Sequence, residues 1–196
     1  AYTVKNNLYV NGRRITDEPL GVVCGQSVHR NEFGIDKGTF LSPDGQHLAF
    51  YRMDQSMVPS YPQVDISQRI ATAYTDRYPM AGEASHHVGV GIYHVATGQT
   101  TWLQLVGEKD DYHTNLSWSP DGSTLYIFEL NRDQNHLRLV AYDVQTGAVK
   151  RQILEERHPK YVEPEHPLTF LPWDDSKAVM QSQRDGYNHL YLLDLK

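Results

Sequence analysis

The chain has 196 residues, a formal net charge of -6, a hydrophobic content of 39% and an aromatic content of 11%. This length allows one domain or a piece of a larger one, and the composition suits a folded chain. The acidic balance and the absence of a basic run argue against a nucleic-acid surface. No apolar segment reaches the roughly 18 residues that a membrane-spanning helix needs. The single cysteine, Cys24, excludes an internal disulfide bond.

The first predicted element is a β-hairpin over residues 7–16. Apolar and polar residues alternate along it, and Asn11-Gly12 is a strong short-range signal for a two-residue hairpin turn. We interpret this hairpin as the end of a repeat unit whose beginning is absent. Residues 17–30 contain two glycines and little periodicity, so we expect a connecting loop there.

Residues 40–51 predict a strand, a tight turn and a second strand. The turn is Ser42-Pro43-Asp44-Gly45, in which proline presets φ, aspartate can bond its own backbone and glycine takes a positive φ at little cost. The same construction returns at residues 116–127 and, in a weaker form, at residues 168–179. Three copies of one hairpin indicate a repeat protein.

The segments between these hairpins are less regular. Residues 52–83 form a long excursion without periodicity, which is typical of a functional or packing loop. A strand over residues 88–95 follows, turns at residues 96–98 and pairs with residues 100–105.

The second repeat unit predicts four short antiparallel strands over about forty residues, which is the size of one β-propeller blade. Its strands are expected at residues 116–118, 124–130, 137–143 and 148–154. The third unit ends before a fourth strand. The predicted fold class is therefore all-β, a partial β-propeller of about three four-stranded antiparallel blades. Open sheet edges and an apolar flank favour association, so a homo-oligomer is one expected partner.

Sequence motifs for catalysis and cofactor binding are missing from the chain. There is no G-x-S-x-G, no P-loop and no H-E-x-x-H. Ten histidines are present, but the adjacent pair His86-His87 points to opposite faces of a strand. We therefore expect no metal and no cofactor. Arg184-Asp185-Gly186 predicts a turn with a solvated arginine.

Glu32 is the one acidic residue that stands apart. It lies in a run with few other acids, after a long loop and at the start of a hairpin. A carboxylate at such a place could receive an ammonium group through charge-assisted hydrogen bonds. A solvated glutamate is the alternative.

An ordered series of motifs resembles the propeller domain of the dipeptidyl peptidase IV family of serine peptidases, and especially its bacterial members, which include prolyl tripeptidyl peptidases. The resemblance covers nearly the whole chain, and its most specific part is the Asp-Gln-Ser-x-Val and Tyr-Pro-x-Ala-Gly pair in this order. The motifs are Glu32–Gly34, Phe40–Phe50, Tyr51–Val58, Tyr78–Gly82, Thr114–Pro120 and Gln181–Tyr191.

The resemblance implies an eight-bladed propeller that caps an α/β-hydrolase domain. Residues 1–196 would be a fragment of the N-terminal propeller, and the serine, aspartate and histidine of the catalytic triad would lie in a C-terminal hydrolase domain of the same protein. The implied substrates are peptides with a free N-terminus and a proline near it, and the implied location is the periplasm or the cell exterior. By itself the fragment is predicted to be inactive.

Acidic residues of the family propeller, on a short helical segment, bind the free α-amine of the substrate. The matching segment is residues 29–33, which makes Glu32 the candidate anchor. The family usually has two adjacent glutamates here, whereas this chain has Asn31 before Glu32. The resemblance therefore leaves open whether the enzyme would release a dipeptide or a tripeptide.

Two further residues match family positions. Tyr161 falls where the family places an aromatic residue that lines the substrate pocket, with a core or rim tyrosine as the alternative. Asp54 is expected to hold the long loop by accepting backbone N–H groups. The rival function is a non-catalytic propeller that binds another protein through its loops.

Overall fold

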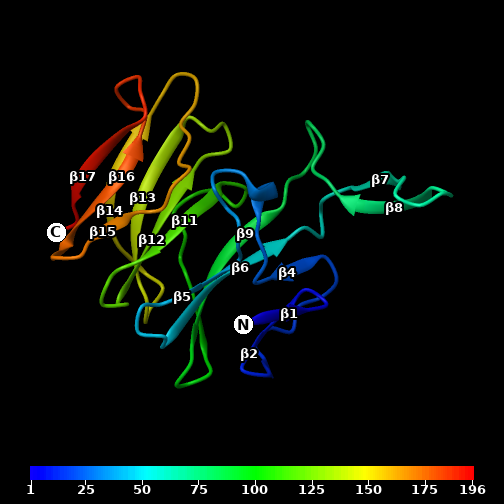
Figure 1. The fold of residues 1–196 in the computed structure, drawn as a ribbon, viewed down its shortest axis with the longest axis horizontal. Coiled ribbons are helices and arrows are strands. Elements are labelled where there is room, and N and C mark those ends of the chain that lie inside the picture. The colour runs from blue at the N-terminus through cyan, green and yellow to red at the C-terminus, as the bar shows by residue number, and fades with distance from the viewer.

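The computed structural model describes residues 1–196 as an all-β molecule with one short 3₁₀ turn, η1 (His29–Asn31). Four antiparallel sheets follow one another and fan out from the N-terminal end of the chain to its C-terminal end (Figure 1). The predicted all-β, partial-propeller fold is confirmed. None of the helical structure is long and apolar enough to cross a membrane.

The first two sheets are formed by residues 2–102. Sheet one has the order β1 (Tyr2–Val4), β2 (Asn7–Val10) and β3 (Arg13–Arg14). Sheet two has the order β10 (Thr100–Trp102), β9 (His87–His94), β6 (His47–Asp54) and β4 (Val22–Cys24), and β5 (Thr39–Leu41) also pairs with β6.

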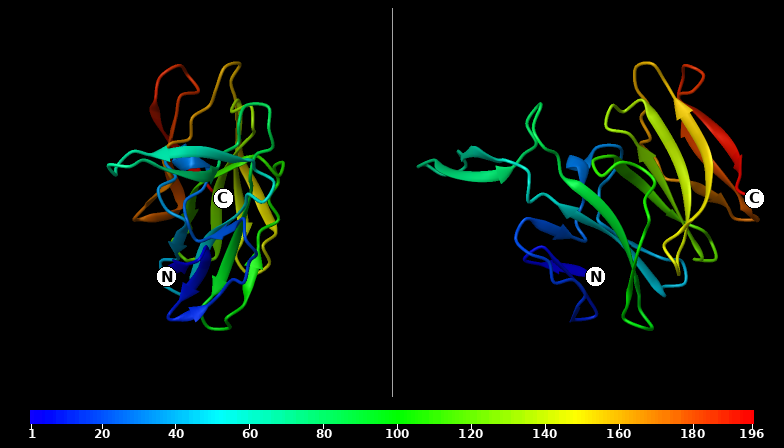
Figure 2. Two further views of the ribbon diagram at one scale, coloured as in Figure 1. Left: turned by 90° about the vertical axis from the view of Figure 1, so that its right-hand side faces the viewer. Right: turned by 180° about the vertical axis from the view of Figure 1, so that it is seen from behind.

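The third and fourth sheets complete the series. Sheet three has the order β11 (Tyr112–Trp118), β12 (Thr124–Leu130), β13 (His136–Asp143) and β14 (Val149–Arg157). Sheet four has the order β15 (Thr169–Leu171), β16 (Asp174–Ser182) and β17 (His189–Asp194). A separate hairpin of β7 (Ser60–Asp65) and β8 (Thr72–Arg77) projects from the body (Figures 1 and 2).

Each pair of neighbouring sheets shares a hydrophobic core, because side chains alternate between the two faces of a strand. On β12, Leu125 and Ile127 face the core shared with sheet two, whereas Tyr126, Phe128 and Leu130 face the core shared with sheet four. A third core joins sheets one and two and includes Leu8, Cys24 and Phe50. The stack of sheets thus buries both faces of its inner members.

The repeated turns have the same internal hydrogen bonds. Asp44 accepts from the backbone N–H of Gln46 at 3.0 Å, and Asp121 accepts from that of Ser123 at 3.0 Å. Gly45 and Gly122 both have a φ of 69°. The pKa of both aspartates is lowered, and the largest cause is a hydrogen bond from a serine hydroxyl, that of Ser42 to Asp44 and that of Ser119 to Asp121. The backbone hydrogen bonds lower the pKa further. The turn residues therefore have a structural explanation.

Two connecting segments were predicted wrongly as irregular. Residues 17–30 contain β4, whose three residues are buried and pair with β6. This strand is too short to show a period. Residues 52–83 contain the β7–β8 hairpin, most of whose residues are exposed. With neither face buried the alternation is lost, and Pro62 within β7 lowers the strand signal.

Strands β4 and β5 lie on the same side of β6, so residues 25–38 leave the sheet and return to it. Both ends of this excursion bond to Tyr51: the Gly25 N–H donates to the Tyr51 carbonyl at 2.8 Å, and the Tyr51 N–H donates to the Gly38 carbonyl at 3.1 Å. A Cβ on Gly38 would lie 2.1 Å from the backbone of Gln26. The glycine therefore permits the close approach that forms the neck of the loop, which presents Glu32.

Candidate functional site

The loop closed at Tyr51 is built around a left-handed turn. His29, Arg30 and Asn31 have φ values of 51°, 57° and 62°, and Phe33 has a φ of 54°. Within the turn, the Glu32 N–H donates to the His29 carbonyl at 3.1 Å. A left-handed conformation costs roughly 1–2 kcal/mol for each residue with a Cβ. Such a turn persists only where its surroundings determine it.

The buried side chain of His29 fixes the first residue of the turn. Its side chain is 2% exposed, and its Nδ1 lies 3.0 Å from Nε2 of His86. Its Nε2 accepts the backbone N–H of His113 at 3.3 Å, and its ring packs against Tyr112. Burial lowers the pKa of His29 and lowers that of His86 to about 4. Both rings are therefore neutral near pH 7, and one donates its ring proton to the other.

Phe33 fixes the turn on its other flank. Its carbonyl accepts hydrogen bonds from the Thr114 hydroxyl at 2.9 Å and from the Asn115 amide at 3.1 Å. Its ring meets the edge of Tyr112 with centroids 5.0 Å apart. Both neighbours of the segment 30–32 are thus attached to β11.

Glu32 lies between these attachments with an exposed side chain. It takes part in none of the ion pairs of the chain. Its own φ and ψ are -69° and 162°, so Glu32 is extended and separates the left-handed residues 29–31 from the left-handed Phe33. The structure therefore presents a carboxylate on a fixed backbone, with its oxygens available to a cation.

Tyr161 lies in the segment that follows β14, and 49% of its surface is exposed. Its ring centroid is 6.0 Å from that of His158, and its N–H donates to the His158 ring. It borders a pocket of about 230 Å³ together with Arg157, Lys160 and Arg184. This exposure rules out a core position for Tyr161, and a rim tyrosine remains the alternative to the predicted pocket-lining role.

Arg184 is exposed and lies in a turn, as predicted, and its side chain also makes contacts that the prediction did not include. Its guanidinium lies 3.3 Å from the carboxylate of Glu156, a residue with 9% exposure, and 4.4 Å from the centroid of the Tyr191 ring. Its Nε donates to the Ser182 hydroxyl. The arginine therefore joins β14, β16 and β17 beside the Tyr161 pocket. Sequence patterns show no such pairing because the partner lies 28 residues away.

Asn115 joins the two candidate segments, a role that sequence reasoning missed. Its Nδ2 donates to the carbonyls of Phe33 and Pro164. Its φ of 53° falls at a bulge in the pairing of β11 with β12. An asparagine in a buried strand is the one available signal, since asparagine tolerates this conformation. The segments that carry Glu32 and Tyr161 are thus both bonded to Asn115 of β11.

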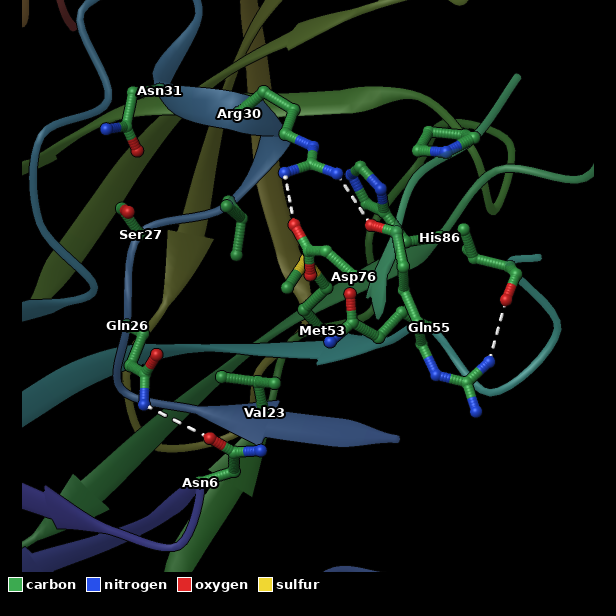
Figure 3. A pocket seen from close by; sticks show the side chains of 14 residues that line it. Asn6, Val23, Gln26, Ser27, Arg30, Asn31, Met53, Gln55, Asp76 and His86 are labelled. Carbon is green, nitrogen blue, oxygen red and sulfur yellow. Dashed lines mark hydrogen bonds and ion pairs between the residues drawn. The ribbon is translucent and has the colours of Figure 1, made fainter. Parts of the chain in front are cut away.

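A larger cavity, of about 510 Å³, borders the turn (Figure 3). Its lining includes Arg30 and Asn31 from the turn, Met53 from β6, and Asp76 and His86 from the segment around the projecting hairpin. Asp54, at the end of β6, accepts the backbone N–H of Ser56 at 2.9 Å, as expected for a loop-holding residue. No group of three or more His, Cys, Asp or Glu side chains has the arrangement of a metal site.

Comparison with known proteins decides the family. The sequence profile described as the dipeptidyl peptidase IV N-terminal region matches residues 1–196. The chain belongs to the dipeptidyl peptidase IV N-terminal region family. The resemblance seen in the sequence is thereby confirmed.

Solved structures and named relatives agree with this assignment. A crystal structure from Bacteroides ovatus, provisionally assigned as a dipeptidyl aminopeptidase IV, is 58% identical with a TM-score of 0.93, covering 99% of this chain and 27% of that chain. Porphyromonas gingivalis dipeptidyl peptidase 4 is 28% identical with a TM-score of 0.81, covering 93% of this chain and 26% of that one. A protein of Phaeosphaeria nodorum, provisionally named dipeptidyl-aminopeptidase B, is 27% identical over 96% of this chain and 24% of its own length. This dipeptidyl peptidase IV N-terminal segment thus spans about a quarter of the length of these relatives.

Proposed function

We propose that residues 1–196 are part of the N-terminal propeller of a post-proline exopeptidase, in which they gate access and bind the free α-amine of the peptide. In this proposal an eight-bladed propeller caps a C-terminal hydrolase domain, which supplies the serine-type triad. The substrates are peptides with a free N-terminus and a proline near it, processed in the periplasm or outside the cell. The family membership and the relatives' names support the peptidase assignment.

The observation that carries the anchoring role is the unpaired Glu32 carboxylate on a turn fixed at both ends. A carboxylate receives an ammonium group through short, charge-assisted hydrogen bonds. Because its backbone is fixed, Glu32 would set how much peptide fits between the amine and the nucleophile. Such positioning can contribute several kcal/mol, up to about 7–11 kcal/mol in well-oriented reactions.

The pocket at Tyr161 supports a second contact with the substrate. An exposed aromatic ring beside a hollow can pack against an apolar side chain of the peptide. Asn31 stands where the family has a second glutamate, and it borders the larger cavity instead of adding charge. The length of the released peptide, two or three residues, is decided by product analysis with a proline-containing peptide.

The test is Glu32→Gln in the full-length protein, with kinetics on a chromogenic proline peptide that has a free amine. We expect KM to rise and kcat/KM to fall by about tenfold to 100-fold, because the neutral amide cannot pair with the ammonium group. Glu83→Gln is the matched control, since Glu83 is an exposed glutamate outside the turn. Unchanged kinetics for Glu32→Gln would remove the residue from the site.

The rival function, a non-catalytic propeller that binds another protein, is tested by the same protein. A full-length protein that releases no dipeptide or tripeptide from such substrates, while it is folded, would favour the scaffold. Release of either product favours the peptidase.

A further inference from the structure

The turn that presents Glu32 also contacts the projecting β7–β8 hairpin. Arg30 Nη1 lies 3.2 Å from a carboxylate oxygen of Asp76, and Nη2 donates to the Arg77 carbonyl at 2.6 Å (Figure 3). The same guanidinium lies 4.6 Å from the centroid of the Tyr78 ring. One planar fork therefore makes a carboxylate contact, a carbonyl contact and a ring contact, which a lysine cannot reproduce together.

The hairpin is attached at its base by Arg77. Its Nη1 donates to the carbonyls of Ser56 and Val58, at 2.9 Å and 2.7 Å. The chain that returns from the hairpin then supplies His86, which bonds His29. Residues 55–86 thus meet the turn at two places, through Arg30 and through His29.

Neither local conformation nor stability explains the arginine. Its φ of 57° favours glycine or asparagine rather than a long side chain. The Arg30 and Asp76 side chains are 42% and 47% exposed, and ion pairs this exposed add little to stability. What the contacts do provide is a fixed direction for the turn, one residue before Asn31 and two before Glu32.

We infer that Arg30 is a positioning residue for the Glu32 carboxylate, and that the β7–β8 hairpin sets the affinity for the substrate amine by binding Arg30. This inference rests on the proposed function of Glu32. Arg30 acts through the turn and touches no reacting atom. Loss of its contacts should leave the turn in place, because His29 and Phe33 still hold it, but should broaden the positions that Glu32 takes.

The test uses Arg30→Ala, Arg30→Lys and Asp76→Asn in the full-length protein, with a free-amine proline peptide as substrate. Arg69→Ala is the matched control, since Arg69 is an exposed arginine at the tip of the same hairpin. We expect KM to rise about tenfold for Arg30→Ala with kcat little changed, and less for the other two variants. The unfolding temperature of each variant should equal that of Arg69→Ala.

A double-mutant cycle separates positioning from a direct effect. In the Glu32→Gln background, Arg30→Ala should cause little further loss, because its effect passes through the missing carboxylate. Additive losses, or Arg30 and Asp76 variants that behave as Arg69→Ala does, would overturn the inference while Glu32 keeps its role. If Glu32→Gln itself changes nothing, the proposed function and this inference both fail. Should Arg30→Ala not fold, Asp76→Asn on the exposed hairpin decides the question alone.

Discussion

The left-handed turn at residues 29–33 is held by side chains that lie outside it. His29 is buried among His86, Tyr112 and the backbone of His113, so its ring replaces solvent with fixed partners. Phe33 contributes its carbonyl and its ring to β11. Because these contacts lie on both flanks, the conformational cost of the turn is met without using the Glu32 carboxylate. An unused carboxylate is what an amine-binding site requires.

The buried histidines predict that stability falls with acidity. Burial lowers the pKa of His86 and of His113 to about 4, and it also lowers the pKa of His29. An unfolded chain protonates histidine near its ordinary pKa of about 6.5. The contribution of these neutral histidines to the free energy of unfolding is therefore fully present above about pH 6.5, and it is lost progressively as the pH falls towards about 4. Urea titrations should show the free energy of unfolding fall by up to about 1.4 kcal/mol per pH unit for each histidine.

The control for this prediction is His113→Phe. The Nδ1 of His113 is buried without a hydrogen-bond partner, so an apolar ring of similar shape removes the titrating group and leaves no new unpaired atom there. This variant should show a shallower pH dependence than the parent chain. A free energy of unfolding that stays level from about pH 7 to 5 would contradict the assignment of these histidines.

At the scale of elements, the sequence predicted what local rules determine. The hairpins at residues 40–51 and 116–127 were predicted because proline, aspartate and glycine act within four residues and apolar residues flank them. The four strands of sheet three were predicted in order, although the first, expected at residues 116–118, begins four residues earlier, at Tyr112. Glu32 was proposed from its isolation among the acidic residues and then from the family resemblance, whereas Tyr161 was proposed from the resemblance alone; both side chains are exposed to a ligand.

Other elements depend on partners far along the chain. Residues 22–24 form a strand because they pair with β6, about thirty residues later in the sequence. They occupy the part of the β6 edge that β5 leaves unpaired. Asn115 donates hydrogen bonds to Phe33, which lies 82 residues away in the sequence, and to Pro164, which lies 49 residues away. Arg30 and Asp76 are 46 residues apart. No period or turn motif encodes such pairings, so the connection between the Glu32 turn, the Tyr161 segment and the hairpin appears only in three dimensions.

Strand β17 carries a prediction about association. It is the edge of sheet four, and Leu190 and Leu192 on its outer face are 71% and 61% exposed. An unpaired edge with exposed leucines is a template for association. The isolated 196-residue chain should therefore form oligomers as its concentration rises, and Leu190→Lys with Leu192→Lys should shift it towards monomers in light scattering.

The matched control for the edge is Leu20→Lys. Leu20 is 93% exposed but lies in a loop rather than on an edge strand. This variant should associate as the parent chain does. If the two lysines on β17 leave the oligomeric state unchanged, association occurs through another surface.

At the scale of the whole molecule, stability comes from stacking. No sheet encloses a core by itself, and each of the three cores is formed between two neighbouring sheets. Such proteins gain stability from nearest-neighbour interfaces, so the inner sheets are the most stable and the outer ones the least. The Glu32 turn is placed on β11, within the best-buried part of the stack, which suits a residue that has to keep its position.

The same architecture predicts that residues 1–196 bind without hydrolysing. Hydrolysis by a serine peptidase needs a serine hydroxyl that is hydrogen-bonded to a histidine ring. Two of the buried serines bond instead to carboxylates, Ser42 to Asp44 and Ser182 to Glu156, and the buried Ser85 hydroxyl has no hydrogen-bond partner. The purified fragment should therefore release no chromophore from proline dipeptide or tripeptide substrates, whereas the full-length protein should. Circular dichroism must first show that the fragment is folded, and an activity that co-elutes with it and is blocked by a serine-directed inhibitor would contradict the division of labour proposed for the two domains.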